Sequence, residues 1–340
     1  MQNQTQYLKK FATTVRLQTN SDYAAQARVL AVPDMLPNSK YRSSDELRLF
    51  REVLKAAFGE KTLLLNACRG RFKPELCATV LLNLWPKRYR PKVVMYGDMF
   101  QQTPGLQGKI ERVIMKVADR AIMRYVVITA AESDVFPQVW GIDKTKMRVC
   151  PYFLEQKRHD KGTMTLPKGQ HIFAGGNSFR NFEPLIEAAR QLPEYEFVLC
   201  TSRLKDRTDL PCNVKAGLVS HEQYVKLIST AAAVVIPLKT GMHRVAGLQT
   251  CFDAMWAKKP TIVTEALGVR EYIDHRKTGM IVDGSPQSYA AAIRWVLDPG
   301  NQEAVAHMCE QAHAILRDQY TLDNHIDHLL AVIDEVIEQS

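Results

Sequence analysis

Short apolar, β-branched runs alternate with helical patterns along the whole chain, and this alternation limits the possible folds more than any other feature. Strands are expected at residues 28–32, 62–65, 92–96, 125–129 and 147–150, and again at 171–174, 196–200, 213–216, 233–237, 261–264 and 280–282. Helices are expected at residues 44–58, 74–85, 109–124, 181–191, 220–230, 247–257, 269–274, 286–297, 302–319 and 322–338. Such alternation predicts parallel sheets with helices on both faces.

A polar segment divides this alternation into two halves. Residues 155–170 are charged and contain Gly162, Pro167 and Gly169, which is typical of a linker. The fold class is therefore predicted to be α/β, with two Rossmann-like doubly wound domains facing a central cleft. The expected parts are residues 1–158, residues 159–320 and a C-terminal helix at 321–340. Doubly wound sheets bind ligands at the carboxyl ends of their strands, so the site is expected there.

The net charge of +9 is distributed unevenly. Residues 1–158 hold 27 Lys and Arg against 14 Asp and Glu, whereas the remaining residues hold 18 against 22. All nine histidines lie at or after His159. The first half therefore favours an anionic partner and contains no imidazole for acid–base chemistry.

Cysteine spacing and hydropathy indicate the compartment. The seven cysteines are scattered and form no close CxxC-type pair, which favours a reducing environment over a zinc site or a disulfide framework. Residues 1–20 lack the apolar core of a secretory leader, and no run approaches the roughly 18 apolar residues of a membrane span. A cytoplasmic protein is expected.

A glycine pair follows the first expected strand of the second half. The sequence Phe173-Ala-Gly-Gly-Asn-Ser-Phe-Arg180 places Gly175 and Gly176 between a strand and a helix. A helix N-terminus reached through such a turn presents backbone N–H groups to an anion, and Arg180 could add a charged fork to a phosphate. A tight turn that merely requires two glycines explains the pattern equally well.

A second loop leads into the helix expected at 247–257. The N–H groups of Leu248, Gln249 and Thr250 would be unsatisfied helix-end donors, suited to a diphosphate. Asp253, one to two turns further on, could accept hydrogen bonds from ribose hydroxyls, or could be a solvated carboxylate. A third stretch, from Thr264 to Asp274, holds Glu271, for which a ligand role and a helix-capping role are about equally supported.

Taken together and in this order, these stretches resemble the C-terminal domain of GT-B fold glycosyltransferases, especially the family 4 type (glycosyl transferases group 1). The resemblance also uses Gly217–Tyr224, Ala233–Leu238, Asp253–Val263 and Thr278-Gly279, and it covers about residues 171–320. The first half matches in layout alone, through Ala118-Asp119, Ser133 at the start of a helix, Gly141-Ile142 and Arg148–Pro151. In that fold the last helix, here 322–338, crosses back to the first domain.

The resemblance implies that the second domain binds a nucleotide-sugar donor, UDP- or GDP-linked, and the first an acceptor. The donor residues would be Gly175, Gly176, Asn177, Ser178, Arg180, Val219, Gly247, Leu248, Gln249, Thr250, Asp253 and Glu271. Within this set the glycines and Arg180 would face the phosphates, Val219 the base through its backbone, and Asp253 the ribose. No cofactor is expected beyond this substrate.

One departure from the family concerns catalysis. Many family 4 enzymes carry a Glu eight residues before the ribose carboxylate, where this chain has Val245 beside His243 and Arg244. His243 or Arg244 is therefore a candidate for neutralising the leaving diphosphate, or the loop is catalytically altered. No acidic pair suited to Mg²⁺ is evident, so metal independence is expected. Asp98, at the end of an expected strand, is the candidate base on the acceptor side, with loop capping as its alternative.

Basic and aromatic residues occur together in the first half. Clusters lie at 69–73 and 85–92, and the helix expected at 109–124 has Ile110, Val113, Ile114 and Val117 on one face with cations at 109, 112, 116, 120 and 124. An anionic membrane surface suits this composition, which would place the protein peripherally on the inner face of a membrane. A nucleic-acid partner is disfavoured because the second half resembles a sugar-donor domain, and a solvated face over a core stripe remains an alternative.

The sequence thus predicts a glycosyltransferase that moves a sugar from a nucleotide diphosphate to a glycan, polysaccharide or lipid-linked acceptor. Two alternatives remain open at this point. One is a nucleotide-sugar epimerase of the same fold, and the other is a non-catalytic membrane- or RNA-binding protein on a GT-B scaffold.

Overall fold

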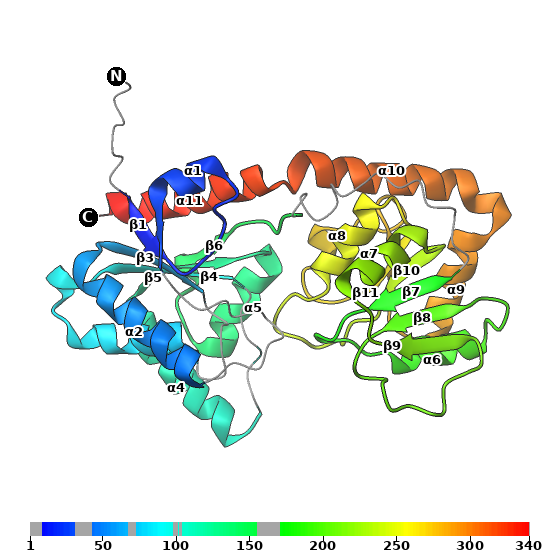
Figure 1. The fold of residues 1–340 in the computed structure, drawn as a ribbon, viewed down its shortest axis with the longest axis horizontal. Coiled ribbons are helices and arrows are strands. Elements are labelled where there is room, and N and C mark those ends of the chain that lie inside the picture. Colours follow the sequence, from blue (N-terminus) through cyan, green and yellow to red (C-terminus); the bar gives the residue numbers. More distant parts are fainter. Residues whose placement is uncertain are drawn as a thin grey trace. The chain divides into compact units, whose positions relative to one another are not determined.

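The structure, a computed structural model, describes residues 9–30, 43–66, 73–97, 101, 104–154 and 171–339 (Figure 1). The chain divides into two compact units. Unit 1 comprises residues 1–151 together with 322–340, and unit 2 comprises residues 152–321. The boundary predicted after residue 158 falls in residues outside the described ranges.

Unit 1 is built on a six-stranded parallel sheet. Its strands are β1 (Phe11–Thr13), β2 (Ala27–Val29), β3 (Thr62–Asn66), β4 (Lys92–Tyr96), β5 (Ile122–Val127) and β6 (Met147–Val149), in the order β2-β1-β3-β4-β5-β6. Its helices are α1 (Ser21–Gln26), α2 (Ser43–Gly59), α3 (Pro74–Leu81), α4 (Leu106–Asp119), α5 (Ala130–Trp140) and α11 (Leu322–Glu338), with short 3-10 turns at Leu82–Leu84, Lys87–Tyr89 and Lys144–Lys146.

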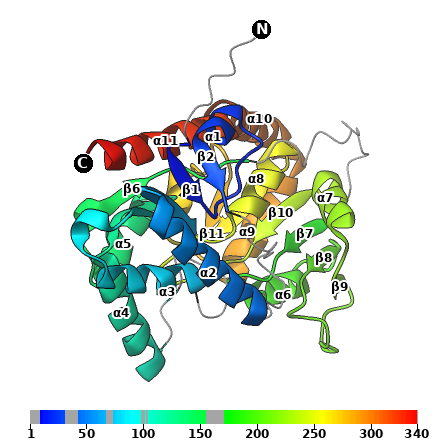
Figure 2. The same cartoon turned by 60° about the vertical axis from the view of Figure 1, so that its left-hand side comes forward.

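The two faces of this sheet bury alternate residues of each strand, as strand geometry requires. Leu63 and Leu65 pack on the face covered by α2 to α5, whereas Leu64 packs on the face covered by α11. Neighbouring strands repeat the pattern, with Val93 and Met95 on the first face and Val94 and Val126 on the second. The C-terminal helix therefore completes the core of unit 1 (Figures 1 and 2).

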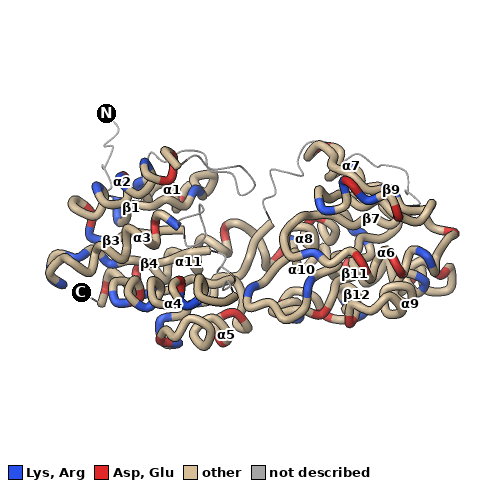
Figure 3. Tube along the Cα trace, turned by 90° about the horizontal axis from the view of Figure 1, so that it is seen from below, with Lys and Arg blue, Asp and Glu red and all other residues tan. Residues whose placement is uncertain are grey.

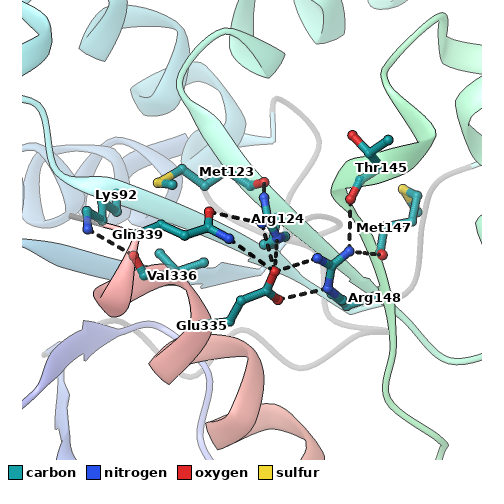
Figure 4. A network of polar contacts seen from close by, with 9 residues as sticks. All are labelled: Lys92, Met123, Arg124, Thr145, Met147, Arg148, Glu335, Val336 and Gln339. Carbon is teal, nitrogen blue, oxygen red and sulfur yellow. Dashed lines mark hydrogen bonds and ion pairs between the residues drawn. The ribbon is translucent and has the colours of Figure 1, made fainter.

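A carboxylate on α11 pairs with two arginines of the sheet (Figure 4). Glu335 accepts from Nε and Nη2 of Arg124 on β5, at 3.0 and 2.7 Å, and from Nε and Nη2 of Arg148 on β6, at 2.8 and 2.5 Å. These hydrogen bonds, from Arg148 first and then Arg124, lower the pKa of Glu335 to about 2. The carboxylate stays ionised under all ordinary conditions and binds α11 to the last two strands.

A buried histidine holds the start of α11. His325 donates from Nδ1 to the carbonyl of Pro151 at 2.7 Å, so its Nε2 accepts from the hydroxyl of Tyr96 at 2.8 Å. The thiol of Cys150 donates to the carbonyl of His325 at 3.1 Å. Burial lowers the pKa of His325 to about 4 and raises that of Cys150 to about 12. Both side chains are therefore neutral near pH 7 and act as buried structural groups.

Unit 2 contains a second six-stranded parallel sheet. Its strands are β7 (Ile172–Gly175), β8 (Phe197–Cys200), β9 (Val214–Gly217), β10 (Ala233–Ile236), β11 (Thr261–Thr264) and β12 (Met280–Val282), in the order β12-β11-β10-β7-β8-β9. Its helices are α6 (Glu183–Arg190), α7 (His221–Thr230), α8 (Leu248–Trp256), α9 (Pro286–Leu297) and α10 (Gln302–Gln319), with 3-10 turns at Val269–Glu271 and Pro299–Asn301. This strand order is that of a doubly wound sheet, whose topological switch point lies between β7 and β10.

Two of the predicted helices are wrong in part. The helix expected at 109–124 begins at Leu106 and ends at Asp119, and Arg124 lies in β5, where it pairs with Glu335. The spacing of the cations suggested one continuous helix, but the apolar run from Ile122 forms a central strand instead. The helix expected at 269–274 is a single 3-10 turn. No helix among the described residues is long and apolar enough to cross a membrane.

Candidate donor site in unit 2

The switch point of the second sheet brings two predicted loops together. The glycine loop follows β7, and the loop before α8 follows β10. An isolated antiparallel bridge joins Arg180 to Leu238, and the N–H of Asn181 donates to the carbonyl of Pro237 at 2.9 Å. The two loops are therefore held side by side at the carboxyl edge of the sheet, where doubly wound folds place their ligands.

Arg180 occupies the centre of this arrangement and is only 5% exposed. Its Nε donates to the carbonyl of Gly175 at 3.0 Å, Nη1 to that of Ser178 at 2.9 Å, and Nη2 to the hydroxyl of Thr250 at 3.3 Å. No carboxylate in the described part of the chain forms an ion pair with it. Burial lowers the pKa of Arg180. A buried cation without a counter-charge is costly, so the site favours an anion.

Three glycines allow this close packing. A Cβ on Gly175 would lie 2.5 Å from the ring of Tyr224, and one on Gly176 would lie 3.0 Å from Nη2 of Arg180. Gly247, the N-cap of α8, has a φ of 86°, and a Cβ there would lie 2.9 Å from Ile236 and 3.5 Å from Nη1 of Arg180. The guanidinium thus lies between the two glycine turns, at the positive end of α8.

Asn177 and Ser178 serve the loop itself. The Asn177 side-chain oxygen accepts from the hydroxyl of Thr201 at 2.8 Å and from the N–H of Ser202 at 2.9 Å, which ties the glycine loop to the loop after β8. Ser178 contributes its carbonyl to Arg180. The exposed Arg203 donates from Nε to the carbonyl of Asn177 at 2.7 Å, and its charge contributes to lowering the pKa of Arg180. A second guanidinium therefore lies close to the first.

The first turns of α8 place the other predicted donor residues on one helix. Leu248 and Thr250 are buried. The Thr250 hydroxyl lies 3.2 Å from that of Tyr224 and accepts a hydrogen bond from Nη2 of Arg180. Asp253, 6% exposed, accepts from Nε2 of Gln249 at 2.8 Å, one helical turn before it. A carboxylate buried this deeply requires hydrogen-bond partners, and the amide of Gln249 supplies one.

Two predicted residues lie at the edges of this region. Val219 is in the loop between β9 and α7, where it and the neighbouring Leu218 are both exposed. Glu271 ends the 3-10 turn after β11, its side chain is exposed, and its carbonyl accepts from the hydroxyl of Tyr320 at 3.1 Å.

The position at which the family usually carries a Glu is apolar and buried here. Val245 is 2% exposed, so it forms part of the core. Arg244 lies over the ring of Phe179, 5.0 Å from its centroid, as a cation–π contact suits. His243 is partly exposed. Phe179 belongs to the glycine loop, so Arg244 reaches toward the same turn as Arg180 from the other loop.

Comparison with solved structures shows which fold this is. Sucrose-phosphate synthase from Thermosynechococcus elongatus matches with a TM-score of 0.66 at 14% identity, over 92% of this chain and 84% of that one. A glycosyltransferase from Rickettsia africae matches with a TM-score of 0.65 at 13% identity, over 97% and 90%. HepE from Anabaena, solved in complex with UDP, matches with a TM-score of 0.64 at 14% identity, over 92% and 87%. No curated protein matches the sequence.

The family comparison falls on the unit with the buried arginine. Residues 172–299 match the family described as glycosyl transferases group 1. The chain thus carries a glycosyl transferases group 1 domain on a GT-B fold. The predicted fold class and the predicted transferase are thereby confirmed.

The predicted catalytic base of this glycosyltransferase, Asp98, lies outside the described residues. At the carboxyl edge of the sheet in unit 1, the structure instead shows Glu75, at the start of α3. Its Oε1 accepts from the hydroxyl of Thr14 at 2.6 Å and from the N–H of Asn66 at 3.3 Å. Within the described ranges, no group of three or more His, Cys, Asp or Glu side chains could hold a metal ion.

Sequence reasoning missed three residues of the site in this glycosyltransferase. Arg203, Tyr224 and Tyr152 all contact predicted donor residues. Arg203 and Tyr224 follow the carboxyl ends of β8 and β9 in the same sheet. That position in the sequence could have indicated that both lie near the ligand site. Tyr152 had no signal, because it precedes the predicted second domain, which begins at residue 159, and reaches α8 only through folding.

Proposed function

We propose that this glycosyltransferase takes its sugar from a nucleoside-diphosphate donor bound at the switch point of unit 2. The observation that carries the proposal is the buried Arg180, which lacks a counter-charge in the described part of the chain. A diphosphate would supply that charge and accept from the N–H groups at the start of α8. HepE, which shares the fold, was solved with UDP. The donor is proposed to be UDP- or GDP-linked.

In the proposed mechanism, the leaving diphosphate is stabilised by fixed positive groups. Arg180 and the N-terminus of α8 are held in place before the reaction, so they need no reorganisation as negative charge develops. Arg244, held over Phe179, is proposed to act on the same charge from the opposite loop. Gly247 to Thr250 bind the diphosphate, Asp253 binds the ribose, and Val219 contacts the base. The reaction is proposed to need no metal, which activity in EDTA would test.

Donor binding is tested by replacing the buried cation. We expect Arg180→Met to lower the affinity for UDP or GDP at least about 100-fold, because a buried charged hydrogen-bonding group is lost. Arg190→Met, on the surface of α6, is the control and should leave affinity unchanged. Calorimetric titration measures both, and urea unfolding shows whether the variant is folded. Unchanged affinity in folded Arg180→Met would refute the proposal.

Turnover is tested separately. Arg244→Ala is expected to lower the rate of sugar transfer strongly while changing donor affinity little, because Arg244 is proposed to act on the charge of the leaving group. Hydrolysis of the donor without acceptor would distinguish a transferase or an epimerase from a non-catalytic protein, and sugar inversion without transfer would favour the epimerase. Full activity in Arg244→Ala would remove this residue from the mechanism.

The acceptor is proposed to be a glycan or lipid-linked glycan that binds to unit 1. A second proposal concerns α4, whose exposed surface supports an anionic membrane as partner. Leu106, Ile110 and Val113 are 74%, 53% and 62% exposed, and they lie opposite the buried Gly108, Met115 and Ala118 of the same helix. Spacings of four and three residues place the exposed apolar side chains in one stripe. In both views one end of α4 projects from the rest of unit 1 (Figures 1 and 2).

Lys and Arg recur along α4 (Figure 3), and their spacing in the helix places three of them beside this stripe on one side. Lys109, Arg112 and Lys116 are exposed, and none pairs with a carboxylate in the described residues. An apolar stripe beside unpaired cations fits the interface of an anionic bilayer, where each cation contributes about 1 kcal/mol. Nucleic acid would use the cations but leave the stripe in water. A membrane surface would place the protein peripherally on the inner face.

Vesicle binding tests this surface. The full chain is expected to sediment with vesicles containing phosphatidylserine at low salt, and far less with phosphatidylcholine alone. Replacing Leu106, Ile110 and Val113 by Ser should abolish binding, and replacing Lys109, Arg112 and Lys116 by Gln should weaken it. The matched control replaces Lys205, Lys215 and Lys226 of unit 2 by Gln. Binding that survives the Ser substitutions, or preference for single-stranded RNA, would contradict the proposal.

A further inference from the structure

Tyr152, the first residue of unit 2, reaches the helix that carries the proposed ribose carboxylate. Its hydroxyl donates to Oε1 of Gln249 at 3.0 Å, and Nε2 of Gln249 donates to Oδ1 of Asp253 at 2.8 Å. The direction of this relay is fixed by chemistry. The carboxylate only accepts, so the amide must present its NH₂ to Asp253 and its oxygen to the tyrosine.

An aromatic cluster fixes Tyr152 in this position. Its ring meets Phe252 edge-on with centroids 5.5 Å apart, and Phe252 in turn contacts Tyr272 and Tyr320 at 5.5 and 5.4 Å. The backbone N–H of Tyr152 donates to the hydroxyl of Tyr272 at 2.8 Å, and that of Leu154 donates to the carbonyl of Tyr320 at 2.9 Å. Tyr152 is thus bound by its backbone, its ring and its hydroxyl.

The same cluster binds the last part of unit 2. Tyr320 lies next to Thr321, after which the chain passes into unit 1. The first and the last residues of unit 2 therefore both pack on α8 through Phe252, the neighbour of Asp253. A carboxylate at this position can rotate about two side-chain bonds, and the relay restricts it to one orientation.

We propose that Tyr152 is a positioning residue for nucleotide binding, which holds Asp253 through Gln249 in the orientation that accepts from the ribose hydroxyls. This rests on the proposed function, in which Asp253 binds the ribose. Fixing the carboxylate before the ligand arrives removes the cost of ordering it on binding. The role concerns the ribose, because the relay from the Tyr152 hydroxyl leads through Gln249 to Asp253.

A comparison of ribose and dideoxyribose ligands tests the positioning role. Calorimetric titration would measure the affinity of UDP, or of GDP if it binds more tightly, and of its 2′,3′-dideoxy analogue. The full chain is compared with Tyr152→Phe, which keeps the ring and loses only the hydroxyl, and with Asp253→Asn. Tyr320→Phe is the matched control, because it removes a hydroxyl from the same cluster without touching the relay.

The unaltered chain is expected to prefer the ribose ligand about 10-fold or more, since hydroxyl groups would donate to a charged acceptor. Asp253→Asn should remove most of this preference. Tyr152→Phe should lower it several-fold while the dideoxy ligand binds as before, and Tyr320→Phe should leave it unchanged.

The outcomes separate the two proposals. A preference that survives in Asp253→Asn, or that is absent from the unaltered chain, overturns the ribose role of Asp253. A preference lost in Asp253→Asn but intact in Tyr152→Phe overturns the positioning role alone. Equal weakening of both ligands in Tyr152→Phe also overturns it, because a general disturbance of the fold would then explain the effect.

Discussion

At the scale of single residues, the sequence located the glycine turns but not the reason for each glycine. Gly175 and Gly176 were predicted as an anion-binding turn, and the structure shows that Gly175 also makes room for the ring of Tyr224. Arg180 was predicted to face phosphate, and its burial against two carbonyls was not foreseeable, because it depends on an isolated bridge to Leu238 in the loop after β10. Contacts between loops that meet only in the folded sheet leave no local pattern.

Gly175→Ala tests the close approach of Tyr224. The new Cβ would lie 2.5 Å from the ring and 2.6 Å from its hydroxyl, so the ring must move from Thr250. We expect a loss of about 1–3 kcal/mol in the free energy of unfolding, as overpacking typically costs. Urea unfolding measures it. Gly217→Ala, at the end of β9 with no heavy atom within 4 Å of the new Cβ, is the control. Equal effects of the two substitutions would contradict the argument.

At the scale of elements, long periodic helices and central strands were predicted well. Helices α9, α10 and α11 and strands β4, β11 and β12 have the predicted bounds. The short β1, of three residues, was missed because a polar segment surrounds it, and α1 was missed with it. Helix α5 begins at Ala130 with Thr129 as its N-cap, earlier than Ser133, and Pro137 inside it obscured the helical pattern. Neighbouring elements decide such cases, and a sequence window does not contain them.

Glu335→Gln tests how α11 is held to its sheet. The substitution removes the charge shared by Arg124 and Arg148 but keeps the size, and we expect a loss of about 1–2 kcal/mol at pH 7. Because the pKa of Glu335 is lowered to about 2 from 4.5, its contribution is complete above pH 4.5 and is lost as the pH falls toward 2. Urea midpoints of the two proteins should therefore converge as the pH falls from about 4.5 toward 2.

The neighbouring residue provides the control for that experiment. Asp334 pairs with Lys10 at 3.0 Å, and both side chains are about half exposed. Asp334→Asn should change the free energy of unfolding by less than about 0.5 kcal/mol, since exposed pairs contribute little. A pH-independent difference between Glu335→Gln and the unaltered chain would show that the charge is not what holds the helix.

At the scale of the whole molecule, each unit has its own core, and this gives a matched pair of predictions. Ile333 on α11 and Ile293 on α9 are both fully buried, in unit 1 and unit 2 respectively. Replacing either by Ala should lower the free energy of unfolding of its own unit by about 2–4 kcal/mol. Scanning calorimetry should show Ile333→Ala lowering one unfolding transition and Ile293→Ala the other. Only the transition lowered by Ile293→Ala should shift to higher temperature when nucleotide is added. At 100 times its dissociation constant, the nucleotide raises the free energy of unfolding of unit 2 by about 2.7 kcal/mol.

Two results would contradict the prediction that the units unfold separately and that unit 2 binds the nucleotide. A single transition that both substitutions lower equally would mean that the units unfold together. A nucleotide that stabilises the transition lowered by Ile333→Ala would place the donor site in unit 1, against the assignment of the switch point between β7 and β10.

The placement of α11 in unit 1 has a consequence for how the chain is made. Unit 2 is one continuous stretch and is complete once Thr321 has been added, whereas unit 1 lacks a helix until residue 338. Until then the face formed by Leu64, Val94 and Val126 lacks the cover of α11. The half that is translated first therefore matures last, and a nascent or prematurely terminated chain carries an open apolar face that a chaperone must protect from aggregation.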